Sequence, residues 1–432
     1  MTLEFFLCIA SLFFIAGLGA PIAYAILVGA IVYMAVGGQS IGIAGKVLMD
    51  GLYQSFIILA VPLFIVAANI MNAGTITDRL LRFCVAWVGR FRGGLGHVNV
   101  VASLIFSGMS GSAVADAAGI GKIIIDMMTK SKYPRGYAAA ITAASATIGP
   151  IIPPSIPMVL YALVSNASIG YLFLGGIMPG LFMGMVLMAM NAWIAHRRGF
   201  ALEEAVPLKQ LPKITFNAIP ALMLPVILLY GIYGGVTTPT EAAAVAAFYA
   251  LILAAIFYRA LSIRKFFSIL VESARSSAAI GLVIGGALIL NYVVASENIP
   301  SRMAQALVGL DVAPILFILG VNILLLLLGC VLDATTIILV IIPLFIPTCR
   351  LLGIDLVHFG VVAVVNCMIG LITPPYGILL FVINAVTRIP LGEIISEIWL
   401  FFAVLVAALF VMILFPELVL WLPKQFGYVP LP

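Results

Sequence analysis

The chain has 432 residues, of which 64% are hydrophobic and 9% are charged, and its formal net charge is +5. A soluble domain is about 45–50% apolar and about 25% charged, so this composition excludes a soluble globular protein. It predicts an all-α polytopic membrane protein with roughly ten spans of about 20 residues each. The positive charges are spread over loops, which indicates membrane topology rather than a nucleic-acid-binding surface.

The chain begins with an apolar stretch, residues 3–36, that two glycines and a proline interrupt. This pattern predicts two short spans. The stretch lacks a basic start and an A-x-A cleavage site, so we expect membrane helices and not a removed signal peptide. Residues 37–54 are more polar and should lie at the membrane interface, and residues 55–73 should form the next span.

Residues 97–130 are predicted to form a re-entrant hairpin. The segment is apolar, but its middle, FSGMSGSAVADAAG from Phe106, is rich in poor helix formers. Basic residues flank the segment on both sides, and short loops rich in Lys and Arg stay cytoplasmic. Both ends should therefore lie inside, with the hairpin tip at residues 108–112.

Residues 137–164 are predicted to form a broken membrane helix. The sequence IGPIIPPSIPMVLY from Ile148 contains four prolines, which remove backbone donors and clash with the preceding turn. At membrane depth a broken backbone persists only where protein or a water-filled cavity satisfies it. With the hairpin, this helix completes a first repeat over residues 1–195, and a polar cytoplasmic linker should follow over residues 196–215.

Residues 216–432 are predicted to repeat the same plan. They contain a second hairpin over residues 303–350, interrupted at GCVLDATT, and a second broken helix over residues 356–388. Five positions of the first break recur 221 residues further along the chain (374 − 153). The recurring residues are Ile148, Gly149, Ile151, Pro153 and Pro154, which become Ile369, Gly370, Ile372, Pro374 and Pro375.

The same pattern predicts how the second repeat is oriented. A cluster of basic residues is expected on the inside, followed by a crossing over 278–295 and a last span over 394–422. The cluster consists of Arg259, Arg264, Lys265 and Arg275. Each repeat then has five crossings and one hairpin, and an odd number of crossings inverts the second repeat. Both chain termini should lie outside. Inverted repeats with broken helices are typical of transporters that alternate access around a midplane site.

The two breaks and two hairpin tips are candidate binding sites. Carbonyl ends of broken helices attract cations, and together with hydroxyls they suit Na⁺, whereas N–H ends suit a carboxylate. For any single glycine or serine, helix packing is the competing interpretation. The candidate sodium ligands are Ser107, Gly108, Ser110, Thr147, Gly149 and Pro150 in the first half, and Gly329, Val331, Gly370 and Thr373 in the second.

Five residues are candidate substrate contacts. Asp333 is a carboxylate within the membrane, where such a group is functional by default, although it can also cap the second arm of its hairpin. Ser112, its counterpart in the first half, has the same two interpretations. Ser155 follows the first proline pair and can cap a helix or face substrate, and its counterpart Tyr376 can line the same cavity. Thr335 is a weaker candidate.

Asp116, one turn beyond Ser112, is interpreted as a helix-start charge and not as a ligand. Neither the tips nor the breaks contain a basic residue, so helix ends and hydroxyls should hold a carboxylate unless Lys122, Arg302 or Arg350 reaches in. The spans contain no nucleophile–base pair or metal-binding motif, so we do not expect an enzyme.

At these motifs the chain resembles the large membrane subunit of tripartite ATP-independent periplasmic (TRAP) transporters. The matching segments are SGMSGSAVADAAGIG from Ser107, IGPIIPPSIPMVLYA from Ile148, GVTTPTEAA from Gly235 and IGLITPPYG from Ile369. The resemblance implies an elevator-type transporter in a bacterial inner membrane, driven by a sodium gradient with two or more Na⁺ ions. It implies a mobile domain of two hairpins and two broken helices within a scaffold of the other spans.

The resemblance also implies partners and substrates. A small four-span membrane subunit, expected here as a separate chain, and a soluble periplasmic substrate-binding protein should assist the transport of organic acids such as sialic acid or C4-dicarboxylates. It assigns sodium coordination to both tip-and-break pairs, and substrate contact to Ser112, Ser155 and Asp333. The alternative is a passive anion channel built from the same hairpins.

Overall fold

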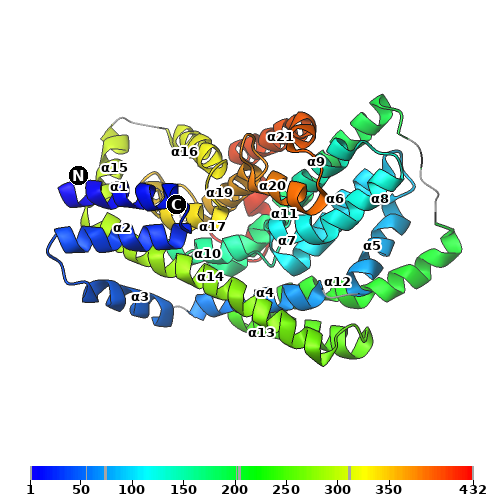
Figure 1. Ribbon diagram of the computed structural model, residues 1–432, viewed down its shortest axis with the longest axis horizontal. Helices are drawn as coiled ribbons and strands as arrows, with labels where there is room; N and C mark the ends of the chain where they lie inside the picture. The colour runs from blue at the N-terminus through cyan, green and yellow to red at the C-terminus, as the bar shows by residue number, and fades with distance from the viewer. Residues whose placement is uncertain are drawn as a thin grey trace.

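Helices account for all of the named secondary structure in the part of the chain that the structure describes, which agrees with the predicted all-α class (Figure 1). The structure is a computed structural model. It describes residues 2–54, 56–72, 75–200, 202, 206–309 and 313–430.

The first half runs from α1 to α11. Its elements are α1 (Leu3–Gly17), α2 (Ile22–Val36), α3 (Gly42–Gln54), η1 (Phe56–Leu59), α4 (Ala60–Met71), α5 (Thr75–Val88), α6 (Gly94–Ser110), α7 (Ala113–Asp116), the π-helix η2 (Ala117–Gly121), α8 (Lys122–Lys130), α9 (Arg135–Ala146), α10 (Ile156–Ser165) and α11 (Ile169–Arg197).

The second half runs from η3 to α22. Its elements are η3 (Leu208–Gln210), α12 (Leu211–Tyr233), α13 (Pro239–Ile252), the π-helix η4 (Leu253–Phe257), α14 (Ile263–Ser296), α15 (Ile299–Gly309), α16 (Pro314–Gly329), α17 (Ala334–Thr336), the π-helix η5 (Ile337–Ile341), η6 (Ile342–Leu344), α18 (Ile346–Leu351), α19 (Leu356–Gly370), α20 (Ile378–Thr387), α21 (Leu391–Leu414) and α22 (Glu417–Gln425).

Five helical segments in the described ranges are long and apolar enough to cross a membrane, and the bent pair of α3 and α4 makes a sixth candidate. The five are α11, Leu208–Tyr233, Pro239–Phe257, α14 and α21. The shorter apolar helices of the described ranges have 10–17 residues, among them the first arm of the first hairpin, both arms of the second, the second half of the first broken helix and both halves of the second. The segments predicted to cross the membrane over residues 3–36, and the two predicted broken helices, therefore consist of short helices.

One helix is longer than its predicted crossing, and one predicted span is divided. α14 contains the crossing expected over 278–295 but begins at Ile263, because Ser262 caps it and Lys and Arg are good helix formers. The single last span over residues 394–422 is two helices, since α21 ends at Leu414 and α22 begins at Glu417. Pro416 disfavours a helical backbone at the residue before it, which explains the break.

The hairpins and the linker differ from their predicted bounds at some ends. The second hairpin, predicted from residue 303, begins its first arm at Pro314, because α15 is a separate helix. The linker is also shorter than the predicted 196–215, since α11 continues to Arg197 and α12 begins at Leu211. Glu203 and Glu204 of the linker lie outside the described residues.

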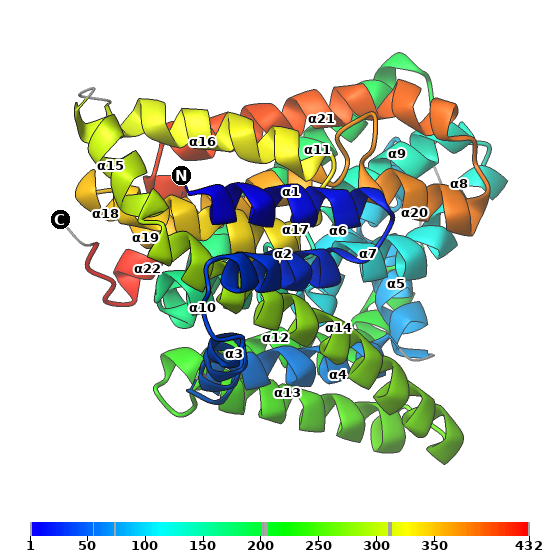
Figure 2. The same ribbon diagram turned by 60° about the vertical axis from the view of Figure 1, so that its left-hand side comes forward.

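The two hairpins approach the middle of the molecule from opposite ends. Figure 2 shows α5 and α8 at one end, and α15, α18, α22 and both chain termini at the other. The first arm of each hairpin, α6 or α16, ends near the centre, where the short helices α7 and α17 begin. This arrangement brings both hairpin tips to the same level, near the middle of the molecule.

The first tip needs glycine at one position. Gly111 has a φ of +56°, a left-handed conformation that other residues adopt at a cost, and an added Cβ would lie 2.5 Å from the carbonyl oxygen of Pro154. Ser112 then begins α7 by accepting a hydrogen bond from the amide of Ala115 at 3.4 Å. The tip of the hairpin therefore packs directly on the first break.

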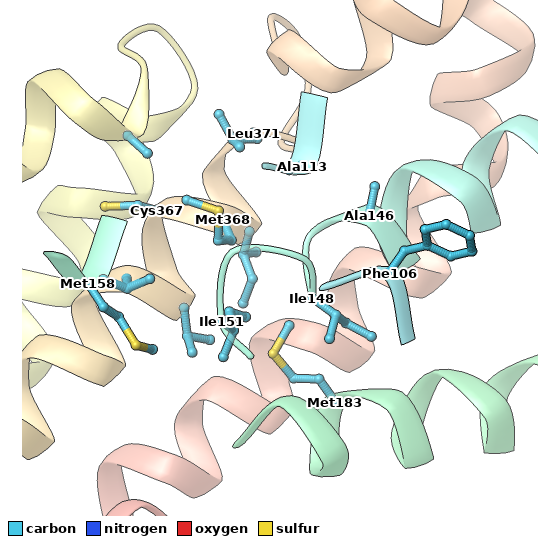
Figure 3. Packing of buried hydrophobic residues seen from close by; sticks show 14 of the residues in the cluster. Phe106, Ala113, Ala146, Ile148, Ile151, Met158, Met183, Cys367, Met368 and Leu371 are labelled. Carbon is cyan, nitrogen blue, oxygen red and sulfur yellow. The ribbon is translucent and has the colours of Figure 1, made fainter. Parts of the chain in front are cut away.

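The breaks lie in a buried apolar core. Figure 3 shows Ile148 and Ile151 on the loop that follows Ala146, near Met183, Met368 and Cys367. All of these side chains belong to one cluster of buried residues that joins the two halves. This buried core therefore holds the breaks of the two halves in a fixed position relative to each other.

The second tip and second break meet through two glycines. A Cβ added to Gly370 would lie 2.8 Å from the Cα atom of Gly329, so α16 and α19 pack backbone against backbone at their ends. Replacing either glycine by a larger residue forces the two helices apart.

We expect Gly370→Ala to lower the unfolding free energy by about 1–3 kcal/mol, because overpacking of this size moves backbone atoms. Gly320→Ala, on α16, is the control, since no atom lies within 4 Å of the added Cβ there. Thermal unfolding of the purified protein in detergent measures both variants. Equal melting temperatures for the two variants would contradict the close contact.

Candidate functional site

One cavity of about 180 Å³ joins both hairpin tips to both breaks. Three predicted substrate contacts, Ser112, Asp333 and Thr335, lie in its wall. The other lining residues are Gly111, Ala113, Val114, Pro150, Ile156, Pro157, Ile280, Ala334, Met368, Leu371 and Ile378. Residues 221 positions apart in the sequence thus meet at one place.

Four helices begin at this cavity. The first residue of each, Ala113 of α7, Ile156 of α10, Ala334 of α17 and Ile378 of α20, lies in its wall. Helix N-termini carry partial positive charge and free N–H groups, so four of them favour an anion between them. No Lys, Arg or His belongs to the described lining, so backbone dipoles and hydroxyls would have to hold any anion there.

The three basic residues considered from the sequence do not line the cavity. Lys122 and Arg302 are exposed. Arg350 donates a hydrogen bond from its guanidinium to the carbonyl of Ser165 at 3.1 Å, which satisfies the C-terminal end of α10. In this conformation none of the three can pair with a ligand between the hairpin tips.

Asp333 caps the second arm of its hairpin and also lines the cavity. One carboxylate oxygen accepts the amide N–H of Thr336 at 3.1 Å, and the other accepts the Thr336 hydroxyl at 2.5 Å. Carboxylate oxygens can accept more than one hydrogen bond, so both interpretations made from the sequence remain compatible with its position.

Ser155 and Tyr376 are placed differently from the other substrate candidates. The Ser155 side chain is fully buried, donates to the carbonyl of Pro150 and accepts from the amide of Met158 at 3.2 Å. It therefore acts as the cap of α10. Tyr376 is 62% exposed with its ring near Phe381, and neither Ser155 nor Tyr376 belongs to the cavity lining.

A polar site surrounds Asp116 where α6, the first arm of the hairpin, and α9, the first half of the broken helix, end. Asp116 was not among the ligands expected from the sequence. The Ser110 hydroxyl donates to Oδ1 of Asp116 at 2.5 Å, whereas Oδ2 accepts no hydrogen bond in the described part of the chain. A Cβ added to Gly149 would lie 2.6 Å from Oδ2, so this oxygen faces the break. Asp116 lies in the first turn of α7, as the sequence indicated, but it is buried, with only 4% of its surface exposed.

Asp116 also borders a space of about 10 Å³, which holds at most one water. Asn99, Ser103 and Thr142 line the same space, and the Asn99 amide donates to the Thr142 hydroxyl at 2.5 Å. A buried carboxylate oxygen without a partner is costly and calls for a cation or a proton. The rule applied to Asp333, that carboxylates within the membrane are functional by default, would have found Asp116 as well.

The other first-half sodium candidates surround the same helix ends. Ser107 and Thr147 donate their hydroxyl hydrogens to carbonyls of their own helices, those of Leu104 and Ala144, so their oxygen lone pairs remain available. A Cβ on Gly108 would contact Pro225 at 3.1 Å. The carbonyl of Pro150 accepts from Ser155, and Pro150 lines the cavity.

The second-half candidates form a less polar counterpart. Gly329 and Gly370 touch, and the Thr373 hydroxyl donates to the carbonyl of Ile369 at 2.9 Å. Val331 has a side chain that is 67% exposed. The oxygen ligands that these four residues can offer are backbone carbonyls and one hydroxyl.

Helices that break at membrane depth around a shared cavity define the architecture of a multi-pass membrane transport protein. The same fold occurs in the crystal structure of the Alcanivorax borkumensis YdaH transporter, with a TM-score of 0.61, 15% identity, and coverage of 87% of this chain and 85% of that chain. At this identity the likeness concerns the fold alone.

The sequence comparisons identify the family. A family model described as the DctM component of tripartite ATP-independent periplasmic transporters matches residues 9–418. The chain is 38% identical over 412 residues to the sialic acid TRAP transporter large permease protein SiaM of Vibrio cholerae, covering 95% of this chain and 96% of that protein. It is also 38% identical over 374 residues to the C4-dicarboxylate TRAP transporter large permease protein DctM of Pseudomonas aeruginosa, covering 87% and 88%.

The chain therefore belongs to the DctM family of TRAP transporter large permease subunits. This confirms the resemblance found in the sequence. It also confirms that the chain is not an enzyme, because these relatives are transporter permeases.

We expect Ser155→Ala to lower the unfolding free energy by about 0.5–2 kcal/mol, because it removes a cap from α10. Ser168→Ala is the matched control, since Ser168 precedes α11 without a side-chain capping bond. Thermal unfolding and substrate affinity should be measured together. A weaker substrate affinity at unchanged stability would instead assign Ser155 to substrate contact.

Proposed function

We propose that this chain is a permease that couples the inward movement of Na⁺ to the uptake of an organic acid across a bacterial inner membrane. The observation that carries this proposal is the cavity at which four helices begin without a basic side chain in its described lining. A carboxylate is the ligand that such a set of helix N-termini favours. Family membership supports the transport function.

The substrate class follows from the same electrostatics. Relatives of equal identity are named for sialic acid and for C4-dicarboxylates, and both compounds carry a carboxylate. Ser112, Asp333 and Thr335 offer hydrogen bonds to the rest of the molecule. We therefore propose an organic acid of the sialic acid or C4-dicarboxylate class, bound between the two hairpin tips.

The proposed sodium sites lie at the opposite helix ends. α6 and α9 end beside Asp116, and α16 and α19 end where Gly329 meets Gly370. Carbonyl ends carry partial negative charge, and hydroxyls and a carboxylate add oxygen ligands of the kind that hard cations prefer. Two sodium ions, one at each pair of ends, would flank the anion and neutralise its charge.

The proposed motion is that of an elevator, in which the hairpins and broken helices move together within the remaining helices. The positive-inside rule supports the proposed orientation of the protein in the membrane. The end of the molecule with α5 and α8 carries the basic clusters, including Arg79, Arg82 and Lys130, and should face the cytoplasm (Figure 2). Both termini would then be periplasmic.

Two partners complete the proposal. TRAP large permeases work with a small membrane subunit and a periplasmic substrate-binding protein, as the resemblance implied. We propose that the binding protein delivers the acid to the end of the molecule with α15 and α22. Exposed apolar side chains on the outer helices, including Phe13, Phe14 and Phe248, would face lipid or the small subunit.

The test is uptake into proteoliposomes that contain this chain and the small subunit, with the binding protein outside. Uptake of sialic acid or a C4-dicarboxylate should saturate, require the binding protein, and stop when an inward Na⁺ gradient is replaced by K⁺. A passive anion channel would instead give a conductance that continues without Na⁺ and does not saturate. That result would exclude coupled transport.

We expect Asp116→Asn to raise the Na⁺ concentration for half-maximal uptake by about tenfold, because it replaces the carboxylate of one sodium site. Asp126→Asn, on an exposed position of α8, is the control and should leave the Na⁺ dependence unchanged. An unchanged Na⁺ dependence in a folded Asp116→Asn protein would remove Asp116 from the site.

The elevator motion predicts that a cross-link between α6 and α12 blocks transport. The Cβ positions of Gly108 and Pro225 are 3.1 Å apart, close to the spacing of a disulfide. Oxidised Gly108→Cys/Pro225→Cys protein should lose uptake and regain it after reduction, whereas each single variant should not respond to oxidation. Full uptake by the cross-linked protein would mean that the hairpin does not slide past α12.

A further inference from the structure

A hollow of about 480 Å³ lies where the end of α5 meets α6 and α11, and it shares no lining residue with the cavity between the hairpin tips. It is at the end of the molecule that carries α5 and α8 (Figure 2). Its walls include Phe91 and Arg92 of the loop after α5, His97 of α6, and Met188, Ala192 and His196 of α11. The hollow therefore combines one guanidinium group and two imidazole rings with apolar side chains.

Contacts between the three segments hold the polar groups of the hollow in place. The Arg92 guanidinium donates to Nδ1 of His196 at 3.4 Å, which joins the loop after α5 to α11. Because Nδ1 of His196 accepts this hydrogen bond, Nε2 carries the ring proton and is a donor. The His97 ring lies edge-on to Phe91, with the ring centres 6.3 Å apart.

The charge of the hollow favours an anion. Among the described residues, no carboxylate lies within ion-pair distance of Arg92, and the described lining contains no Asp or Glu. A guanidinium group has five N–H donors, so Arg92 keeps donors for a ligand besides the one directed at His196. Phosphate oxygens are the anionic groups that a guanidinium binds most strongly, through paired charge-assisted hydrogen bonds.

One ridge of α11 runs through the hollow and continues beyond it. Met188, Ala192 and His196 line the hollow, and Met185 and Leu181 precede them on the same face at spacings of three and four residues. Met185 is 56% exposed and Leu181 is 43% exposed. Since α11 is a candidate membrane span, this ridge gives an apolar path from the hollow into the membrane.

A ridge of α6 runs beside the ridge of α11. His97 lines the hollow, and Val101 and Leu104 follow it on the same face of α6 and are half-buried. Leu104 packs against α11, because a Cβ added to Gly184 would lie 2.7 Å from Cδ1 of Leu104. The apolar path therefore has one side on each helix.

Two tryptophans mark the level of the hollow relative to the membrane. Trp87 precedes the lining residue Val88, Trp193 follows the lining residue Ala192, and each tryptophan is 49% exposed. Exposed tryptophans are enriched at the level of the lipid head groups. The hollow should therefore lie at this level, with the ridges of α6 and α11 extending into the hydrocarbon.

We propose that this hollow binds the head group of an anionic phospholipid of the phosphatidylglycerol class. The phosphate diester accepts hydrogen bonds from Arg92 and from Nε2 of His196, and an acyl chain lies along Met188, Met185 and Leu181. Basic pockets between membrane helices bind lipid head groups in this way. The inference does not depend on the transported substrate or on sodium coupling.

Charge and the apolar path favour this lipid over two other sources of phosphate. A zwitterionic lipid has no net charge to draw it to a basic site, and its ammonium group finds no carboxylate in the described lining. A free phosphate ion can pair with Arg92 but leaves the apolar path without a partner.

The experiment measures lipid binding to the full chain, purified with its small subunit in detergent, by native mass spectrometry. Thermal unfolding checks that each variant is folded. The probes are short-chain phosphatidylglycerol, short-chain phosphatidylethanolamine and inorganic phosphate. Arg92→Gln removes the guanidinium group, and Ala192→Trp fills the hollow without changing its charge. Arg197→Gln is the matched control, because Arg197 is exposed on α11 and does not line the hollow.

We expect the wild-type protein to bind phosphatidylglycerol more tightly than either of the other probes. Arg92→Gln and Ala192→Trp should each weaken the tightest phosphatidylglycerol binding about tenfold, and Arg197→Gln should leave it unchanged. Equal wild-type binding of phosphatidylethanolamine or of inorganic phosphate would overturn the proposal. Unchanged phosphatidylglycerol binding in either folded variant, Arg92→Gln or Ala192→Trp, would overturn it as well.

Discussion

The unpaired backbone groups at the ends of helices broken inside a membrane are the constraint on which the rest of this structure depends. Hydrocarbon offers no hydrogen bonds, so every freed carbonyl and N–H group must find a partner within the protein or bind a ligand. The chain meets this constraint by gathering like ends together. The N-terminal ends of α7, α10, α17 and α20 line one cavity, while the C-terminal ends of α6 and α9, and of α16 and α19, meet in two pairs. Partial positive charge thus concentrates at one place and partial negative charge at two others.

This separation of charge gives the proposed coupling a physical basis. An anion in the central cavity and cations at the carbonyl ends would attract one another through a water-poor interior, where electrostatic interactions are stronger than in water. The attraction would make the binding of acid and sodium cooperative without any basic side chain. It also explains why Asp116 is tolerated in the interior, because an ion beside its free oxygen would offset the cost of burying the carboxylate.

The two halves share a plan but differ in chemistry. In the first half, Ser110 and Asp116 supply hydroxyl and carboxylate oxygens next to Gly149. In the second, Gly329 and Gly370 pack backbone against backbone, and Thr373 supplies a hydroxyl. Of the two proposed sodium sites, the first would hold its cation with side chains, whereas the second would depend on carbonyl geometry and on the close contact of two glycines. Capping residues show a similar division, because Ser155 is committed to α10 while Asp333 both caps its helix and faces the cavity.

The sequence by itself determined the membrane class, the two hairpins, the two breaks and their constant spacing, because apolar composition, proline and glycine act locally and leave a readable pattern. It also selected Ser112, Asp333 and Thr335, which line the cavity. It did not indicate that α14 extends back to Ile263 or that the last span is divided before α22. Only the tertiary structure decided that Ser155 is a buried cap, that Tyr376 points away, and that Asp116 turns inward to Ser110. Those outcomes depend on which helix ends meet, and that pairing is set by long-range packing that no local pattern encodes.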